Sequence, residues 1–166
     1  MSTLTQSGEE ILLGPLEELE EVVAQPIPGR EREWAGQAAE AVAAVVLALY
    51  RCEAAAVGPD GLFAGVDLTR PTLVRQAGAL RQDQHTLRER ACSLQAQLEE
   101  TAQTFERVDN LQGTDHLPPP VANSAIPDFG SLRQQAEHLV QALLSYREEE
   151  ARLLLESVNT DIGVGD

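Results

Sequence analysis

The sequence predicts an all-α protein, an antiparallel up-down four-helix bundle formed by a single domain over residues 1–166. Apolar residues make up 43% of the chain and aromatic residues only 4%. Ala and Leu, which dominate the apolar set, favour helices, whereas the residues that favour strands are sparse. Four segments place apolar residues three and four positions apart, with Gly and Pro between the segments. Each such helix must bury one face against a neighbour, and a bundle buries all four.

The first predicted helix covers residues 8–24. Its apolar residues follow spacings of four, three and four, which put them on one face of a helix. Pro15 falls early in the segment, where a first turn tolerates it, so the regular helix is expected to begin near this residue. The sequence PIPG at 26–29 ends the helix. The apolar face consists of Leu12, Leu16, Leu19 and Val23.

The second predicted helix covers residues 30–56 and carries a broad apolar stripe, which indicates a well-buried helix. GPDG at 58–61 ends it, because Gly and Pro interrupt helical backbone. The connector that follows, 61–71, is expected to place Leu62 and Phe63 over the end of the core. The stripe consists of Trp34, Ala38, Ala41, Val45, Ala48, Cys52 and Ala55.

The third predicted helix, 71–108, is the longest, and its apolar residues keep nearly a seven-residue repeat. The fourth covers residues 131–158, with Ser131 as its expected N-cap. Between them lies a proline-rich loop, about 113–130, which is expected to be flexible, as is the N-terminus over about residues 1–8.

The chain carries a formal net charge of -15, from 27 acidic and 12 basic residues. Such a surface repels phosphate backbones, so nucleic-acid binding is not expected. It also repels anionic membrane surfaces. The longest apolar run, 41–49, is too short to span a bilayer, so no membrane partner is expected.

The beginning of the chain, MSTLTQSGEE, lacks the positive charge and apolar run of a secretory signal. Cys52 and Cys92 fall on different predicted helices and lack the spacing of a zinc site or a disulfide framework. A cytoplasmic protein with free thiols is therefore the expectation. The chain also contains no glycine-rich phosphate loop, no nucleophile elbow and no pair of histidines four residues apart.

Polar residues on an apolar stripe are the candidates for chemistry, because bundles bind metals through inward-pointing side chains. Glu150 lies four residues after Tyr146 on the inner stripe of the last helix. A buried carboxylate requires a metal, a cation or a proton. Two simpler alternatives are that Glu150 reaches solvent near the end of the bundle, or that it pairs with an arginine such as Arg51.

The third helix is interrupted in a similar way by Gln84 and its neighbour His85. A lone histidine at the flank of a stripe is more often solvated or hydrogen bonded than a metal ligand. His138 falls off the inner stripe, and His116 lies in the proline-rich loop. Cys52 is expected to act as a small apolar residue of the core.

Three stretches resemble the bacterial hemerythrin-like domain family. They are YREEEARLLLESVNTDIGVGD at 146–166, ALYRCEAAAVGPDGLF at 48–63 and LRQDQHTLRE at 80–89. The resemblance implies a four-helix bundle around a di-iron site whose ligands are mainly histidines. In the family the last helix carries a His one turn before an acidic ligand, and the second helix carries a His-x-x-x-Glu motif.

This chain departs from that pattern at most ligand positions. The first helix contains no histidine, the second has Arg51, Cys52 and Glu53 in place of the motif, and Tyr146 stands where a His belongs. His85 and Glu150 match ligand positions. The resemblance thus implies a family member without its iron, and Glu53, His85 and Glu150 are the metal-ligand candidates.

The sequence leads to a non-catalytic helical bundle with a structural, regulatory or partner-binding function and no cofactor. One alternative is an iron-binding protein that uses a reduced carboxylate and histidine site. The other is an oligomerisation module in which the long third helix binds another bundle. The partner would be an unidentified protein, and the chain itself would be a monomer or a homodimer.

Overall fold

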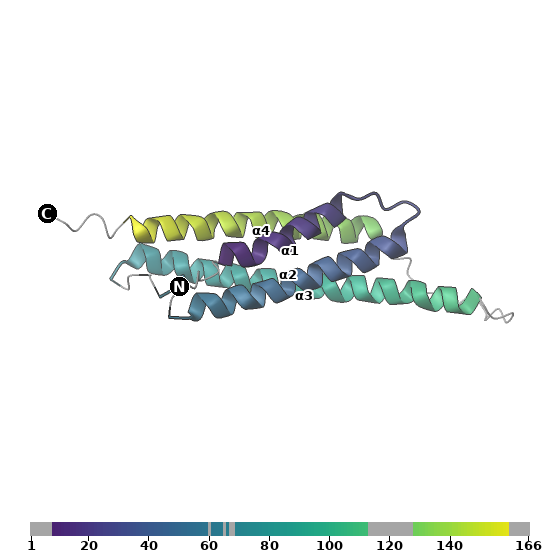
Figure 1. The fold of residues 1–166 in the computed structure, drawn as a ribbon, viewed down its shortest axis with the longest axis horizontal. Helices are drawn as coiled ribbons and strands as arrows, with labels where there is room; N and C mark the ends of the chain where they lie inside the picture. The colour runs from purple at the N-terminus through teal and green to yellow at the C-terminus, as the bar shows by residue number, and fades with distance from the viewer. Residues whose placement is uncertain (1–7, 60, 65, 67–68, 113–127, 160–166) are drawn as a thin grey trace, which may run out of the picture.

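The protein is a bundle of four helices, seen in a computed structural model (Figure 1). The structure describes residues 8–59, 61–64, 66, 69–112 and 128–159. The helices are α1 (Gly8–Ala24), α2 (Glu31–Val57), α3 (Pro71–Gln112) and α4 (Phe129–Val158). All regular secondary structure in these ranges is helical, as the composition predicts. The predicted flexible N-terminus over 1–7 and most of the proline-rich loop, 113–127, lie outside the described residues.

Successive helices run in alternate directions, so the bundle has the up-down order that the sequence predicts (Figure 1). α1 packs against α2, α2 against α3 and α3 against α4, and α4 closes the ring by packing against α1. α3 has 42 residues against 17 in α1, and its C-terminal end extends past the other helices. The apolar faces predicted for the four segments form one continuous core.

Two helix starts differ from the prediction. α1 begins at Gly8 and contains Pro15 inside it, because the fully buried Leu12 holds the turn before the proline in the core. α4 begins at Phe129, and its N-cap is Asp128 and not Ser131. The Asp128 carboxylate accepts a hydrogen bond from the Ser131 backbone N–H at 3.1 Å, so Ser131 supplies a donor inside the first turn.

The helix ends follow the Gly and Pro positions. Gly29 adopts φ 79°, a conformation that L side chains rarely adopt, and lets the chain turn from α1 into α2. α2 begins without a side-chain cap, and two acidic residues in its first turn, Glu31 and Glu33, complement the positive end of the helix dipole. α3 continues four residues beyond the predicted end at Val108, up to the residue before Gly113.

One end of the bundle is joined by aromatic side chains. The ring of Phe129 on α4 lies 6.3 Å from that of Trp34 on α2 and 5.8 Å from that of Phe105 on α3, measured between centroids. The Trp34 indole N–H donates to the carbonyl of Val22 on α1 at 3.1 Å. Aromatic pairs at these separations add stability beyond the area they bury. This cluster fixes the register of all four helices at this end.

The opposite end is covered by the connector between α2 and α3. Leu62 and Phe63 pack against the core, as predicted, and Val66 is buried within it. Gly61 approaches the last turn of α2 so closely that an added Cβ would lie 2.3 Å from the Ala56 carbonyl oxygen. Within the described ranges, none of the helices combines the length and the apolar character needed to cross a membrane.

Candidate functional site

A small group of polar side chains interrupts the core where α2, α3 and α4 meet. Glu150 and Tyr146 are only 7% and 4% exposed, and Cys52 is 3% exposed. The prediction that Glu150 lies on the inner face of α4 is confirmed, and the alternative that it reaches solvent is wrong. The charge of Glu150 raises the pKa of both the Cys52 thiol and the Tyr146 hydroxyl, so the three groups are electrostatically coupled.

Gln84 of α3 belongs to the same layer, which we call the inner polar layer: Cys52, Gln84, Tyr146 and Glu150. The side chains of Gln97 and Gln135 hydrogen bond to each other, which sets the antiparallel register of α3 and α4. Thirteen residues before Gln97 on α3 and thirteen residues after Gln135 on α4, this register places Gln84 level with residue 148, between Tyr146 and Glu150. Gln84 is 5% exposed, and its amide nitrogen has no hydrogen-bond partner among the described residues.

Burial keeps the Cys52 thiol and the Tyr146 hydroxyl protonated at neutral pH. Desolvation first, and the Glu150 carboxylate second, raise the pKa of the Cys52 thiol to about 12. The same two causes, in the same order, raise the pKa of Tyr146 above its ordinary value, with smaller effects of Cys52 and Asp83. A thiol with such a high pKa is a poor nucleophile and a poor metal ligand. Cys52 therefore acts as a small core residue, as the sequence predicts.

Glu53 and His85 lie elsewhere, on the outer side of the contact between α2 and α3. The Arg88 guanidinium forms an ion pair with the Glu53 carboxylate, and it donates to His85 Nδ1 at 3.0 Å. His85 Nε2 lies 3.3 Å from the Glu89 carboxylate. A neutral imidazole protonated on Nε2 satisfies both contacts. Both ring nitrogens of His85 thus have protein partners.

These placements do not fit the iron site that the family resemblance implies. The Arg88 guanidinium already occupies the space between Glu53 and His85 with a positive charge, while Glu150 belongs to the inner polar layer. Over the described ranges, no three His, Cys, Asp or Glu side chains form a group that could hold a metal ion. A di-iron bundle instead needs several inward-pointing ligands from facing helices.

The other described polar residues that the sequence analysis considered do not join the inner polar layer or the Arg88 contacts. Arg51 is exposed on α2 and forms no ion pair with a described residue, so Arg51 is not the arginine of the alternative in which Glu150 pairs with one. His138 is exposed on α4, as predicted. Cys92 is a free, exposed thiol on α3. His116 lies outside the described residues.

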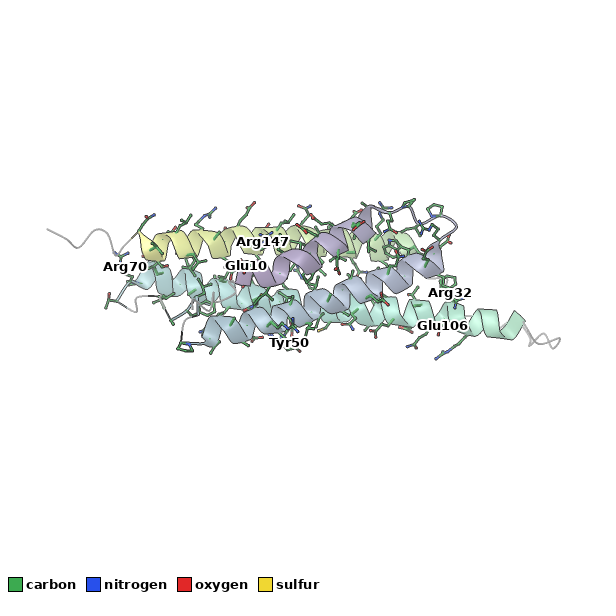
Figure 2. The ribbon with its side chains drawn as sticks, in the orientation of Figure 1. Glu10, Arg32, Tyr50, Arg70, Glu106 and Arg147 are labelled. Carbon is green, nitrogen blue, oxygen red and sulfur yellow. The ribbon has the colours of Figure 1, made fainter. Side chains whose placement is uncertain are left out.

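The structure shows a second apolar stripe on α2, on its exposed side, which the sequence did not predict. Leu47, Tyr50 and Val57 are between 51% and 68% exposed, and Ala54 between them is also exposed. Their spacing of three, four and three places them on one face, which we call the outer α2 stripe. Figure 2 shows Tyr50 along the lower edge of the bundle, whereas α4 runs along the upper edge. The spacing of three, four and three is present in the sequence. It did not predict a separate stripe, because the apolar residues of α2 already predict one broad, well-buried face.

The α3 side of the outer α2 stripe carries Arg88. Its guanidinium carbon lies 4.9 Å from the centroid of the Tyr50 ring, within the range of a cation–π contact. Seven residues earlier, and hence on the same face of α3, the guanidinium of Arg81 lies 4.2 Å from the centroid of Phe63 in the connector. The outer side of α2 and α3 is therefore apolar with two arginines beside it.

Comparisons with protein-family models, with curated proteins and with solved structures find no match to this chain, so the site rests on its own geometry.

Proposed function

We propose that this chain is a non-catalytic helical bundle that binds a protein partner through the outer α2 stripe. The exposure of Leu47, Tyr50 and Val57 along one helical face carries the proposal. Single exposed apolar residues are ordinary on a protein surface, but several on one stripe are typical of a helix-binding surface. Tyr and Arg are also the residues that most often dominate the binding energy of interfaces, and Tyr50 and Arg88 lie together here.

The inner polar layer supports the non-catalytic part of the proposal. Cys52 and Tyr146 are buried and protonated at neutral pH, so neither is poised to act as a nucleophile or base. The kinship with hemerythrin-like proteins remains part of the proposal, as a relative that has kept the bundle and lost the iron. Since unrelated proteins share this architecture, the fold alone does not establish that kinship.

Position-specific photocrosslinking in cells of the source organism tests the proposal. A photoreactive residue at position 50 should yield an adduct of defined mass that is identifiable by mass spectrometry. The adduct should disappear when Leu47→Glu and Val57→Glu are added, because charge on the stripe prevents apolar burial. A photoreactive residue at position 155, where Leu155 is 65% exposed on α4, is the matched control.

Two outcomes would contradict the proposal. One is the absence of a defined adduct from position 50, and the other is the same set of adducts from positions 50 and 155. Sedimentation velocity of the purified chain distinguishes a second copy of the chain from a different protein, because self-association depends on concentration. Iron analysis of protein purified without a metal-affinity tag tests the metal-binding alternative, and about two irons per chain would favour it.

A further inference from the structure

A small cavity lies between the connector and the first third of α3. Its volume is about 250 Å³. It does not belong to the inner polar layer, and none of the metal-ligand candidates lines it. The walls are apolar apart from one arginine, which is the composition of a site for a mostly apolar ligand with one charged group. The lining residues are Phe63, Val66, Val74, Ala77, Gly78 and Arg81.

Gly78 lies in the α3 wall of this cavity. Glycine weakens the interior of a helix, so its presence in α3 calls for a local reason. Packing does not supply one, since a Cβ added at Gly78 would meet no other atom within 4 Å. Gly78 lines the cavity and is exposed, as are Val74 and Arg81, so the cavity opens to solvent on this side. A larger side chain at this position would project into that space and fill it.

Arg81 supplies the positive charge in the wall of this cavity. Arg30, Arg88, Arg133 and Arg152 each form an ion pair with a Glu, whereas Arg81 has none among the described residues. Its described contact is with the ring of Phe63, whose centroid is 4.2 Å from the guanidinium carbon. Stacking uses the face of a guanidinium and leaves its in-plane N–H groups available for a carboxylate.

We propose that this cavity binds a small amphipathic monocarboxylate, such as a medium-chain fatty acid. Its apolar chain would lie between Phe63, Val74 and Gly78, and its carboxylate would bind the Arg81 guanidinium in a bidentate manner. The cavity of about 250 Å³ has room for a short apolar chain. This site goes beyond the proposed partner binding and does not depend on it.

Titration of the full chain with octanoate, followed by calorimetry and by NMR of backbone amides, tests the site. Saturable binding of one octanoate per chain is expected, with shifts centred on residues 63–81. Octanol has the same chain without the charge and should bind at least about tenfold more weakly, because a charge-assisted contact is lost. The absence of saturable octanoate binding, or equal binding of octanol, would overturn the proposal.

Two variants locate the ligand within the cavity. Arg81→Gln should weaken octanoate binding about tenfold or more, while Arg75→Gln, on the exposed surface of the same helix, should leave it unchanged. Gly78→Leu should abolish binding by filling the cavity. The control Gly14→Leu, at another glycine with open space around it, should not affect binding.

Circular dichroism establishes that each variant is folded. If Gly78→Leu does not fold, two measurements decide the result: octanoate binding by Arg81→Gln and octanol binding by the wild-type chain. If Arg81→Gln and Gly78→Leu both bind octanoate with wild-type affinity, octanoate binds elsewhere, as an adventitious additive only. That result would overturn the proposed site.

Discussion

Glu150 raises the question of how one carboxylate is accommodated in a core made of Ala and Leu. It lies one turn after Tyr146, and both are almost fully buried. Burial of a carboxylate is costly unless neighbouring groups compensate it. Within the described part of the chain Glu150 is not isolated, and Cys52 and Tyr146 of the inner polar layer are among its neighbours. The nature of its compensation can be measured by substitution.

We expect Glu150→Gln to retain or slightly raise the melting temperature, because it removes a buried charge and keeps the shape and polar atoms of the side chain. Glu150→Leu should destabilise the protein more, since it leaves the hydrogen-bonding groups around it without a partner. Thermal and urea melts provide the measurement, with Glu149→Gln, at the exposed neighbouring position, as the control. A loss of about 3–5 kcal/mol in Glu150→Gln would instead show that a buried cation depends on this charge.

Cys52 gives a second prediction, on the pH dependence of stability. The pKa of its thiol rises from an ordinary value of 9.0 to about 12 in the folded protein. Above pH 9 the unfolded chain therefore releases this proton while the folded protein retains it, so the free energy of unfolding falls as the pH rises. The decrease for one such group approaches about 1.4 kcal/mol per pH unit. The raised pKa of Tyr146 acts in the same direction.

Urea unfolding between pH 7 and 11, under reducing conditions, measures this effect. The free energy of unfolding should decline above about pH 9. The decline should be shallower in Cys52→Ala, because that variant keeps the raised pKa of Tyr146 but lacks the Cys52 thiol. Cys92→Ala, which changes an exposed thiol, should reproduce the wild-type slope. Identical slopes for wild type and Cys52→Ala would show that the folded protein does not hold the Cys52 proton more tightly than the unfolded chain.

At the scale of the helices and their connections, the contact of Gly61 with the end of α2 is the tightest constraint. The Gly61 backbone N–H donates to the Gly58 carbonyl at 2.9 Å, and the Phe63 N–H donates to the Ala56 carbonyl at 3.4 Å. These bonds fold the connector back against the last turn of α2. The connector then covers the core with Leu62 and Phe63 and forms one wall of the cavity beside Gly78.

We expect Gly61→Ala to destabilise the protein by about 1–3 kcal/mol, because the new Cβ would lie within 2.5 Å of backbone atoms at the end of α2. Gly36→Ala is the matched control, since a Cβ at Gly36 meets nothing within 4 Å and Ala favours the interior of α2. That variant should be as stable as wild type or slightly more stable. Equal stability of Gly61→Ala and wild type in thermal melts would show that the connector can move away from α2.

At the scale of the whole molecule, the distribution of charge follows the helices. α1 exposes a strongly acidic face that includes Glu10, Glu17, Glu18, Glu20 and Glu21. The outer side of α2 and α3 instead carries the outer α2 stripe together with Arg81 and Arg88. The proposed partner site and the proposed carboxylate site thus each include an arginine, on a protein whose net charge is -15.

The net charge predicts that the protein does not bind duplex DNA at near-physiological salt, since an acidic surface gains nothing from releasing phosphate counterions. Gel-shift titrations with duplex DNA from about 50 to 200 mM salt provide the measurement. A shift that weakens as salt rises would contradict this prediction, because that dependence is typical of cationic groups bound to phosphates.

The sequence by itself determined the four helices and most of the inner faces. Their periodicity is local, so it predicts which residues of a helix are buried before the neighbours are known. The burial of Gln84 and Glu150 followed from this pattern. The position of Leu62 and Phe63 over the core was expected separately, from two apolar residues in the connector. The start of α4 was wrong by two residues because Asp128 and Ser131 are both suitable cap residues.

The tertiary structure alone decided which side chains meet between helices. Contacts such as those of Arg88 with Glu53, Tyr50 and His85 depend on the rotation and register of α2 against α3. The packing of the whole core sets both, so no spacing within one helix reveals them. The same rotation exposes the outer α2 stripe, and the fold of the connector onto α3 forms the cavity beside Gly78 and Arg81. The candidate sites arise between elements, whereas the sequence pattern describes each element separately.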